Sequence, residues 1–167
     1  ADDALMEKFF ETGTLSQDEL MAGLKAAVMQ RRVFPLFLTS STTNIGIPQL
    51  LDALVGYAPS PADRPMKATS KAGDEVDCPA SDTAPLGVFV WKRIAGPFAG
   101  RISLFRVAPG TLKSDTTVHN ATKDSSGRLG TLSLMQGKTQ TAVPEVRAGD
   151  IGAIAKLKDT HTGGALG

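Results

Sequence analysis

The chain has few of the side chains that carry covalent or metal chemistry. Its 167 residues include one cysteine, Cys78, and two histidines, His119 and His161. A lone cysteine cannot form an intramolecular disulfide, and two scattered histidines leave no zinc-binding constellation. The Gly-x-Ser-x-Gly elbow of serine hydrolases is also absent from the sequence. The sequence therefore predicts no catalytic nucleophile and no metal site.

Long apolar runs are missing as well. No window approaches the roughly 18 apolar residues that a membrane span requires. The first residues, Ala1-Asp2-Asp3, lack the cationic region of a secretory leader. Together with the single thiol, this composition predicts a cytoplasmic protein that has no membrane partner.

Charge is distributed unevenly between the two halves of the chain. Residues 1–84 carry seven Lys or Arg and twelve Asp or Glu, a net charge of −5. Residues 85–167 carry eleven Lys or Arg and five Asp or Glu, a net charge of +6. Because Lys and Arg neutralise phosphates, the second half favours a polyanion as its partner. A solvated charged surface is the alternative that charge alone leaves open.

The first third of the chain has helical periodicity. Apolar spacing predicts helices over residues 3–11, 16–32 and 48–57. The second helix begins with a capping box, Ser16-Gln17-Asp18-Glu19. Between the second and third helices, the apolar run at 33–38 is typical of a strand buried in a parallel sheet. Residues 1–57 are thus predicted to be the last piece of a doubly wound α/β domain, which is incomplete because one strand cannot form a sheet.

The rest of the chain divides into a linker and a strand-rich segment. Residues 58–84 contain four prolines and little apolar periodicity, so we predict a flexible linker. Six strands are then predicted, over residues 86–94, 101–108, 116–122, 128–135, 139–143 and 151–157. Short strands separated by turn residues indicate a small, closed, antiparallel six-stranded β-barrel over 85–167. The predicted fold class is therefore α+β.

Two motifs resemble phosphate-binding elements without completing them. Gly137-Lys138-Thr139 resembles the end of a P-loop, but Leu132 stands where that loop requires a glycine. Asp124-Ser125-Ser126-Gly127 fits a four-residue magnesium-site pattern, yet these residue types also favour a tight turn. The guanine-reading Asn-Lys-x-Asp motif is absent from the sequence. We predict turns between strands at both places.

The polar loop at 39–46 is the remaining candidate for ligand chemistry. It follows the predicted buried strand and precedes a helix, which is the usual ligand crevice of an open α/β sheet. A polar loop that only caps the next helix is the alternative.

Longer stretches of the chain resemble a known family. These stretches are the run from Gly96 to Leu112, the turn Ala148-Gly149-Asp150-Ile151-Gly152, Leu157-Lys158-Asp159-Thr160 and Thr162-Gly163. With them, residues 85–167 resemble the second domain of elongation factor G, the ribosomal translocase, and residues 5–61 resemble the end of that family's nucleotide domain. The resemblance implies an internal fragment of a translational GTPase, whose parent protein hydrolyses GTP with Mg²⁺ during translocation of transfer and messenger RNA.

The resemblance also implies one edge of a guanine site in the 39–46 loop. Ser40 matches the serine of the family's last guanine motif, and Ser41 matches the alanine whose backbone N–H donates to the guanine carbonyl oxygen. Thr42 matches the variable third position, and Asn44 and Gly46 match the Asn and Gly beyond it. The phosphate cradle and magnesium ligands are not in this piece, so we expect the chain alone to be catalytically inactive.

In the family, the second domain contacts small-subunit ribosomal RNA and packs against the nucleotide domain of the same parent chain. We expect the loop-borne Lys113, Lys123 and Arg128 to be the RNA contacts, because strand positions alternate with buried ones. A non-enzymatic RNA-binding barrel is one alternative. A paralogue that acts in ribosome recycling is another, since Ser41 and the run from Thr162 to Leu166 depart from the mainstream translocase.

Overall fold

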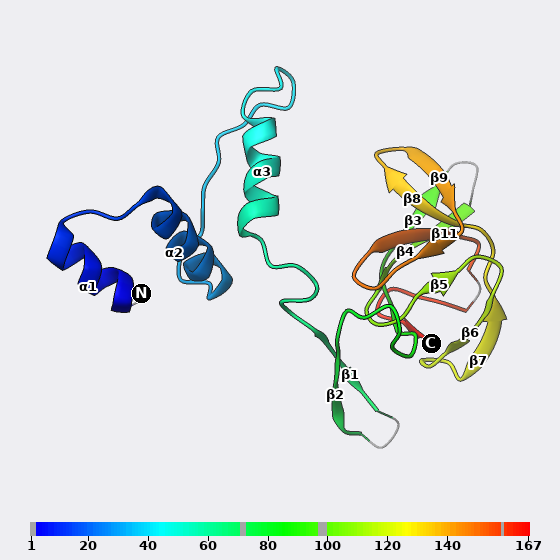
Figure 1. Ribbon diagram of the computed structural model, residues 1–167. Helices are drawn as coiled ribbons and strands as arrows, with labels where there is room; N and C mark the ends of the chain where they lie inside the picture. Colours follow the sequence, from blue (N-terminus) through cyan, green and yellow to red (C-terminus); the bar gives the residue numbers. More distant parts are fainter. Residues whose placement is uncertain (1–2, 71–72, 97–99, 158) are drawn as a thin grey trace. The chain divides into compact units, whose positions relative to one another are not determined.

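The computed structural model describes residues 3–70, 73–96, 100–157 and 159–167. The chain forms two compact units, Ala1–Pro59 and Ser60–Gly167. The first unit is helical, and its helices are α1 (Asp3–Thr12), α2 (Gln17–Met29) and α3 (Ile47–Tyr57) (Figure 1). All three predicted helices are therefore present.

The ends of α1 and α2 follow from local sequence. Gly13 adopts a φ of 71° after α1, and its N–H donates to the Phe9 carbonyl over 2.8 Å. Both halves of the predicted capping box form at α2, where Ser16 Oγ accepts from the Glu19 N–H and the Glu19 carboxylate accepts from the Ser16 N–H. Helix α2 ends three residues before the predicted position, because Arg31 takes a left-handed φ of 60°.

The predicted strand over 33–38 does not form. No strand pairs with this segment among the described residues, and the nearest bridge joins Ser40 to Ile45. Its apolar side chains are open to solvent: Phe34 is 80% exposed, and Leu36 and Leu38 are each 87% exposed. A strand needs hydrogen-bonding neighbours on its edges, so an apolar run without them stays an extended segment.

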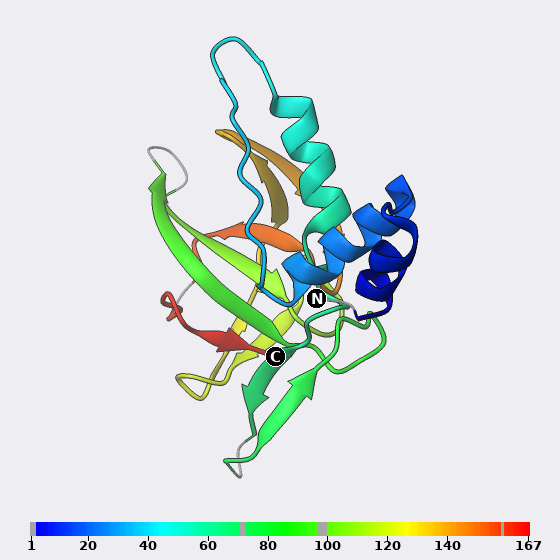
Figure 2. The same cartoon turned by 90° about the vertical axis from the view of Figure 1, so that its left-hand side faces the viewer.

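The second unit consists of antiparallel strands. Its strands are β1 (Met66–Thr69), β2 (Glu75–Cys78), β3 (Val88–Gly96), β4 (Gly100–Val107), β5 (Leu112–Lys113), β6 (Thr117–Asn120), β7 (Ser125–Arg128), β8 (Leu132–Gln136), β9 (Thr139–Val143), β10 (Glu145–Val146), β11 (Ile151–Ala155) and β12 (Ala165–Leu166). Eight of them form one sheet in the order β7-β6-β12-β3-β4-β11-β8-β9, and β10 pairs with β5. The two longest, β3 and β4, form a curved hairpin (green in Figure 2). The fold is the expected β-barrel-like domain in an α+β chain.

The strand count differs from the prediction of six. The strand expected over 128–135 corresponds to β8, and β7 lies mostly where a turn was predicted. Residues 129–131 separate these two strands. The N–H of Leu129 donates to the Thr116 carbonyl over 2.8 Å, and its side chain is buried. β5, β10 and β12 have two residues each, which is too short for an alternating pattern to reveal.

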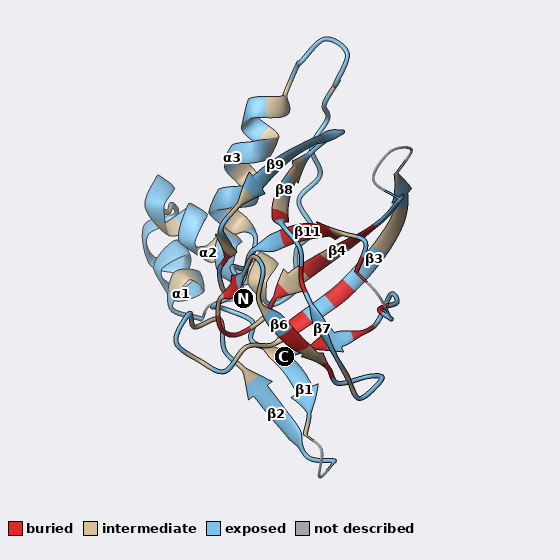
Figure 3. Ribbon diagram, turned by 90° about the vertical axis from the view of Figure 1, so that its right-hand side faces the viewer, coloured by how far each residue is buried: buried red, intermediate tan, exposed pale blue. Residues whose placement is uncertain are grey.

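The buried residues lie on the strands of the second unit and in the segments between them. Figure 3 shows this distribution, with red confined to the strands and their connections and only tan and blue on the helices. The core residues are Val88, Val90, Phe105, Val107, Leu112, Val118, Leu129, Leu132, Val146, Ile154, Leu157 and Leu166. They come from eight different strands and the segments between them, so the core holds the barrel-like sheet together.

The segment at 58–84 has more structure than the predicted linker. β1 and β2 form a hairpin there, and Lys67 and Glu75 make an ion pair of 2.7 Å across it. The segment after the hairpin is hydrogen-bonded to the barrel, because Asp82 Oδ1 accepts a hydrogen bond of 3.0 Å from the Ala148 N–H. Cross-strand pairing of largely exposed residues formed this hairpin, and apolar periodicity could not reveal it.

The predicted turn at Gly137 is confirmed, whereas the one predicted over 124–127 was wrong for all but Asp124. Gly137-Lys138 joins β8 to β9, and Gly137 has the positive φ, 60°, that a two-residue hairpin turn requires at its first position. Asp124 adopts a φ of 50° in the turn before β7, while residues 125–127 belong to that strand. Residues 97–99 and 158 of the family-like stretches lie outside the described residues.

Candidate functional site

The loop at 39–46 brings the three predicted guanine-site residues together in one tight turn. The Ser40 N–H donates to the Ile45 carbonyl over 2.9 Å, and the Ser40 and Thr42 hydroxyls lie 3.2 Å apart. Asn44 completes the turn with a φ of 58°. Ser41 is exposed within this turn. The loop is thus a defined structure that presents Ser41 to solvent.

The alternative role of this loop, capping the next helix, is not what its side chains do. Gly46 is the residue before α3, and no side-chain hydrogen bond caps that helix end. A Cβ at residue 46 would lie 2.8 Å from the Leu38 carbonyl oxygen, and its φ is 73°. Glycine is therefore required here for close approach of the backbone.

The loop carries the three residues that the sequence predicted for one contact to a guanine base. Ser41 is an exposed residue, and a backbone N–H is the kind of donor that such a contact needs. Metal binding has no counterpart, since no group of three or more His, Cys, Asp or Glu side chains within the described ranges could hold an ion. The role of Ser40, Ser41 and Thr42 stays a prediction.

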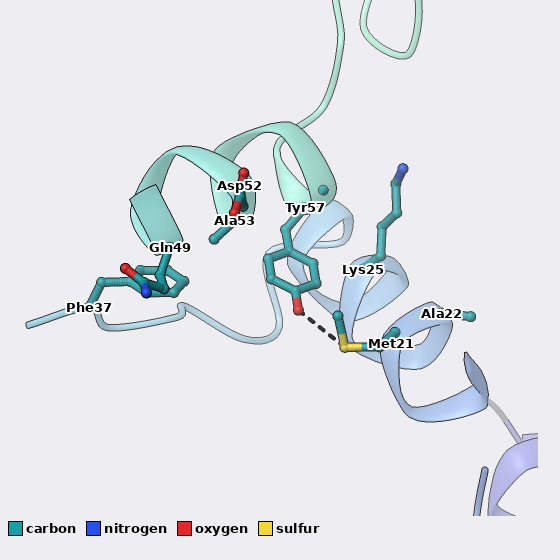
Figure 4. Close-up of a pocket in the computed structure, with 9 residues that line it drawn as sticks. Met21, Ala22, Lys25, Phe37, Gln49, Asp52, Ala53 and Tyr57 are labelled. Atoms are coloured by element: carbon teal, nitrogen blue, oxygen red, sulfur yellow. Dashed lines mark hydrogen bonds between the residues drawn. The ribbon is translucent and has the colours of Figure 1, made fainter. Parts of the chain in front are cut away.

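A hollow of about 470 Å³ lies between α2 and α3 (Figure 4). The Tyr57 hydroxyl donates to the Met21 sulfur across it over 3.2 Å. Most of its lining is apolar, and Lys25 extends away from the hollow in Figure 4. Specific ligand sites hold several convergent polar groups, so we regard this hollow as a gap in helix packing.

The three predicted RNA contacts are all exposed, but only one lies in a loop. Lys123 is in the turn between β6 and β7, as expected. Lys113 is the second residue of β5, and Arg128 is the last residue of β7, so the expectation of loop positions was wrong for these two. Lys123 and Arg128 share the β6–β7 hairpin, whereas Lys113 lies opposite Glu145 on the β5–β10 pair.

A second hollow, of about 320 Å³, lies beside β7, and we call it the β7 hollow. Arg128 lines it together with Lys156, a residue that the sequence placed inside a predicted strand. Lys156 instead follows β11 and takes a left-handed φ of 58°. Hydroxyl-bearing and acidic side chains also line the β7 hollow, namely Ser125, Ser126, Thr160 and Asp159. No motif spacing distinguished Lys156, because its partners come from a different hairpin.

The antiparallel strands of the second unit enclose one core and define a β-barrel-like domain. Residues 85–167 match the family model of elongation factor G domain 2. These residues therefore belong to that family, which is a module of translational GTPases.

One solved structure extends this similarity over both units. The crystal structure of ttk003000868 from Thermus thermophilus matches 99% of this chain with a TM-score of 0.72 and 27% sequence identity. The chain spans 22% of that protein's chain. In the part of our chain that the structure describes, no helix is both long and apolar enough to cross a membrane.

Proposed function

We propose that this chain is part of a ribosome-dependent GTPase similar to elongation factor G, and that its barrel domain docks on small-subunit ribosomal RNA in the cytoplasm. The family match over residues 85–167 is the observation that carries the proposal. The net charge of +6 over the same residues supports it, because phosphate neutralisation supplies most sequence-independent affinity for nucleic acid.

In this proposal the parent protein binds GTP with Mg²⁺ and hydrolyses it during translocation. Residues 40–42 supply one edge of the base site, and other parts of the parent protein hold the phosphates and the metal. Phosphoryl transfer depends on those groups, so the chain by itself is expected to leave GTP intact.

Binding to small ribosomal subunits at several salt concentrations tests the RNA contact. The full chain is sedimented with purified subunits, and the bound fraction is measured at each concentration. With three phosphate contacts, affinity should fall about 40-fold between about 50 and 200 mM salt. Absence of binding at low salt, or binding that does not respond to salt, would contradict the proposal.

The departure from the family at 164–165 lies at the start of β12 and in the turn before it. Ala165 pairs with Phe89 inside the sheet. A Cβ on Gly164 would lie 3.0 Å from the His161 carbonyl oxygen, so a small residue suits this turn. Translocation is the function that we propose first, and ribosome recycling is the alternative.

A further inference from the structure

We infer that the β7 hollow seats a phosphodiester group of RNA, with Arg128 and Lys156 as its two cationic contacts. This inference rests on the proposed function, because it names the place where the barrel domain holds the RNA backbone. It adds Lys156, Asp159 and Asn120 to the residues that determine RNA affinity.

Two cations from distant parts of the chain meet at this hollow. Arg128 ends β7, and Lys156 follows β11. The backbone of Lys156 is fixed, since its N–H donates to the Arg101 carbonyl over 2.9 Å. A non-glycine residue with a left-handed φ costs about 1–2 kcal/mol, and here that conformation sets the direction in which a lysine leaves the sheet.

Neutral donors surround the two cations. Ser125 and Ser126 of β7 and Thr160 line the hollow. β7 is an edge strand of its sheet and pairs only with β6, so its outer edge faces no other strand among the described residues. Hydroxyls and backbone N–H groups are frequent donors to phosphate oxygens.

The site is held in place by a buried amide. Asn120 is 6% exposed, and its Nδ2 donates to the Asp159 carbonyl over 3.0 Å. Its Oδ1 accepts from the N–H groups of Thr122 and Lys123 over 3.1 and 3.2 Å. Asn120 thus joins the β6–β7 turn to the segment after β11, and a site fixed before binding loses less entropy when the ligand arrives.

The carboxylate of Asp159 would repel a phosphate bound in the hollow. Asp159 lines the β7 hollow, and its Oδ1 lies 4.0 Å from Lys123 Nζ. Arg128 and Lys156 thus line the hollow with one carboxylate among the described residues, so its lining is net positive. Removing the charge of Asp159 should strengthen phosphate binding. If the site instead held a metal ion or a basic peptide, the same change would weaken its binding.

The lining favours the RNA backbone over the bases. No aromatic side chain lines the β7 hollow within the described part of the chain. Proteins that hold single-stranded bases usually stack them on aromatic rings, and cations with hydroxyls instead bind phosphates without reading sequence. The barrel would therefore contact RNA through its shape and charge.

The test measures binding of a short RNA hairpin to the full chain by fluorescence anisotropy, with Arg128→Gln, Lys156→Gln and Asp159→Asn as variants. Lys138→Gln is the matched control, because Lys138 lies in the β8–β9 turn and does not line the hollow. The first two changes should each weaken binding about three- to tenfold and reduce the salt slope by about one. Asp159→Asn should strengthen binding about two- to fivefold, and the control should stay within about twofold.

Amide spectra of the chain, recorded during titration with the same hairpin and with inorganic phosphate, locate the site and verify folding of each variant. Shifts at residues 125–128 and 159–160 support the inference. Equal loss of affinity in Lys138→Gln and the hollow variants would indicate diffuse attraction and overturn it. If the chain binds ribosomal subunits but the amides of the hollow do not shift, the inference is overturned and the proposed function stands. If the hairpin binds in the hollow but the chain does not bind subunits, the inference stands and the proposed function is overturned. Saturation by inorganic phosphate that the hairpin cannot displace would also overturn the RNA assignment.

Discussion

Gly152 lies where two core side chains leave no room for another atom. It pairs with Phe105 between β11 and β4, and Phe105 is 1% exposed. A Cβ at position 152 would lie 2.6 Å from Phe105 Cζ and 3.0 Å from Val146 Cγ2. Glycine is needed here for space and not for backbone conformation, since an aromatic ring packs directly over the strand.

Gly152→Ala should therefore destabilise the barrel domain. Overpacking of a closed core costs about 1–3 kcal/mol, and urea unfolding followed by tryptophan fluorescence would measure it. Gly130→Ala is the control, because a Cβ there meets nothing within 4 Å. An alanine at 152 that unfolds at the same urea concentration as the parent chain would show that Phe105 can move aside.

The exposure of a single residue could be predicted from the sequence where the residue is charged. The basic residues Lys113, Lys123 and Arg128 are exposed as expected, but their assignment to loops failed for two of them. Lys156 was missed because its importance depends on a tertiary neighbour, Arg128, that is separated from it along the chain by the strands from β8 to β11. Spacing along a chain cannot report such a meeting.

The capping box at the start of α2 formed as the sequence predicted. Lys8 of α1 adds a charge to it through an ion pair with Glu19. The hydrogen bond from Lys8, with those from the Ser16 backbone and side chain, lowers the pKa of Glu19 to about 2. The carboxylate is thus favoured in the folded helix pair over the unfolded chain.

This pKa gives α2 a dependence on acid. The pKa of Glu19 in the folded chain lies below its ordinary value of 4.5. The stability that ionised Glu19 adds to the folded helices is therefore fully present above about pH 4.5 and is lost as the pH falls toward 2. Helicity measured by circular dichroism should decline over that range in the parent chain. Glu19→Gln should start lower and change less between the same pH values, and an equally steep decline in the variant would assign the effect to other carboxylates.

The elements that sequence reasoning missed share a physical cause. Caps and helical periodicity are local, and the helices were found from them. The extended run at 33–38 and the β1–β2 hairpin depend on whether a second strand lies alongside. Strand pairing is non-local and cannot be seen in a short stretch of sequence. The apolar run at 33–38, which has no partner strand among the described residues, was therefore predicted as a strand, and the two polar strands of the β1–β2 hairpin were predicted as a linker.

On the scale of the whole molecule, burial is confined to one unit. The described residues of the first unit include no buried side chain, whereas the second unit contains the whole core cluster. Helices in proteins owe most of their stability to packing of an apolar face. The two units should therefore differ strongly in local stability.

Hydrogen exchange of the intact chain would measure this difference. Amides of α1, α2 and α3 should exchange on the order of a hundredfold or more faster than hydrogen-bonded amides of β3, β4 and β11. Comparable protection in both units would mean that the helices are covered, and analytical ultracentrifugation would then show whether a second copy covers them.

The position of β12 has a consequence for how the protein is made. Leu166 pairs with Val88 of β3 on one side and with Asn120 of β6 on the other, so the last of these strands to be synthesised fills the middle of the sheet. During translation, the edges of β3 and β6 that pair with β12 stay unpaired until residue 166 has left the exit tunnel. Closure of the barrel therefore waits for synthesis of β12, and chaperones have a defined interval in which to shield the open edges of β3 and β6.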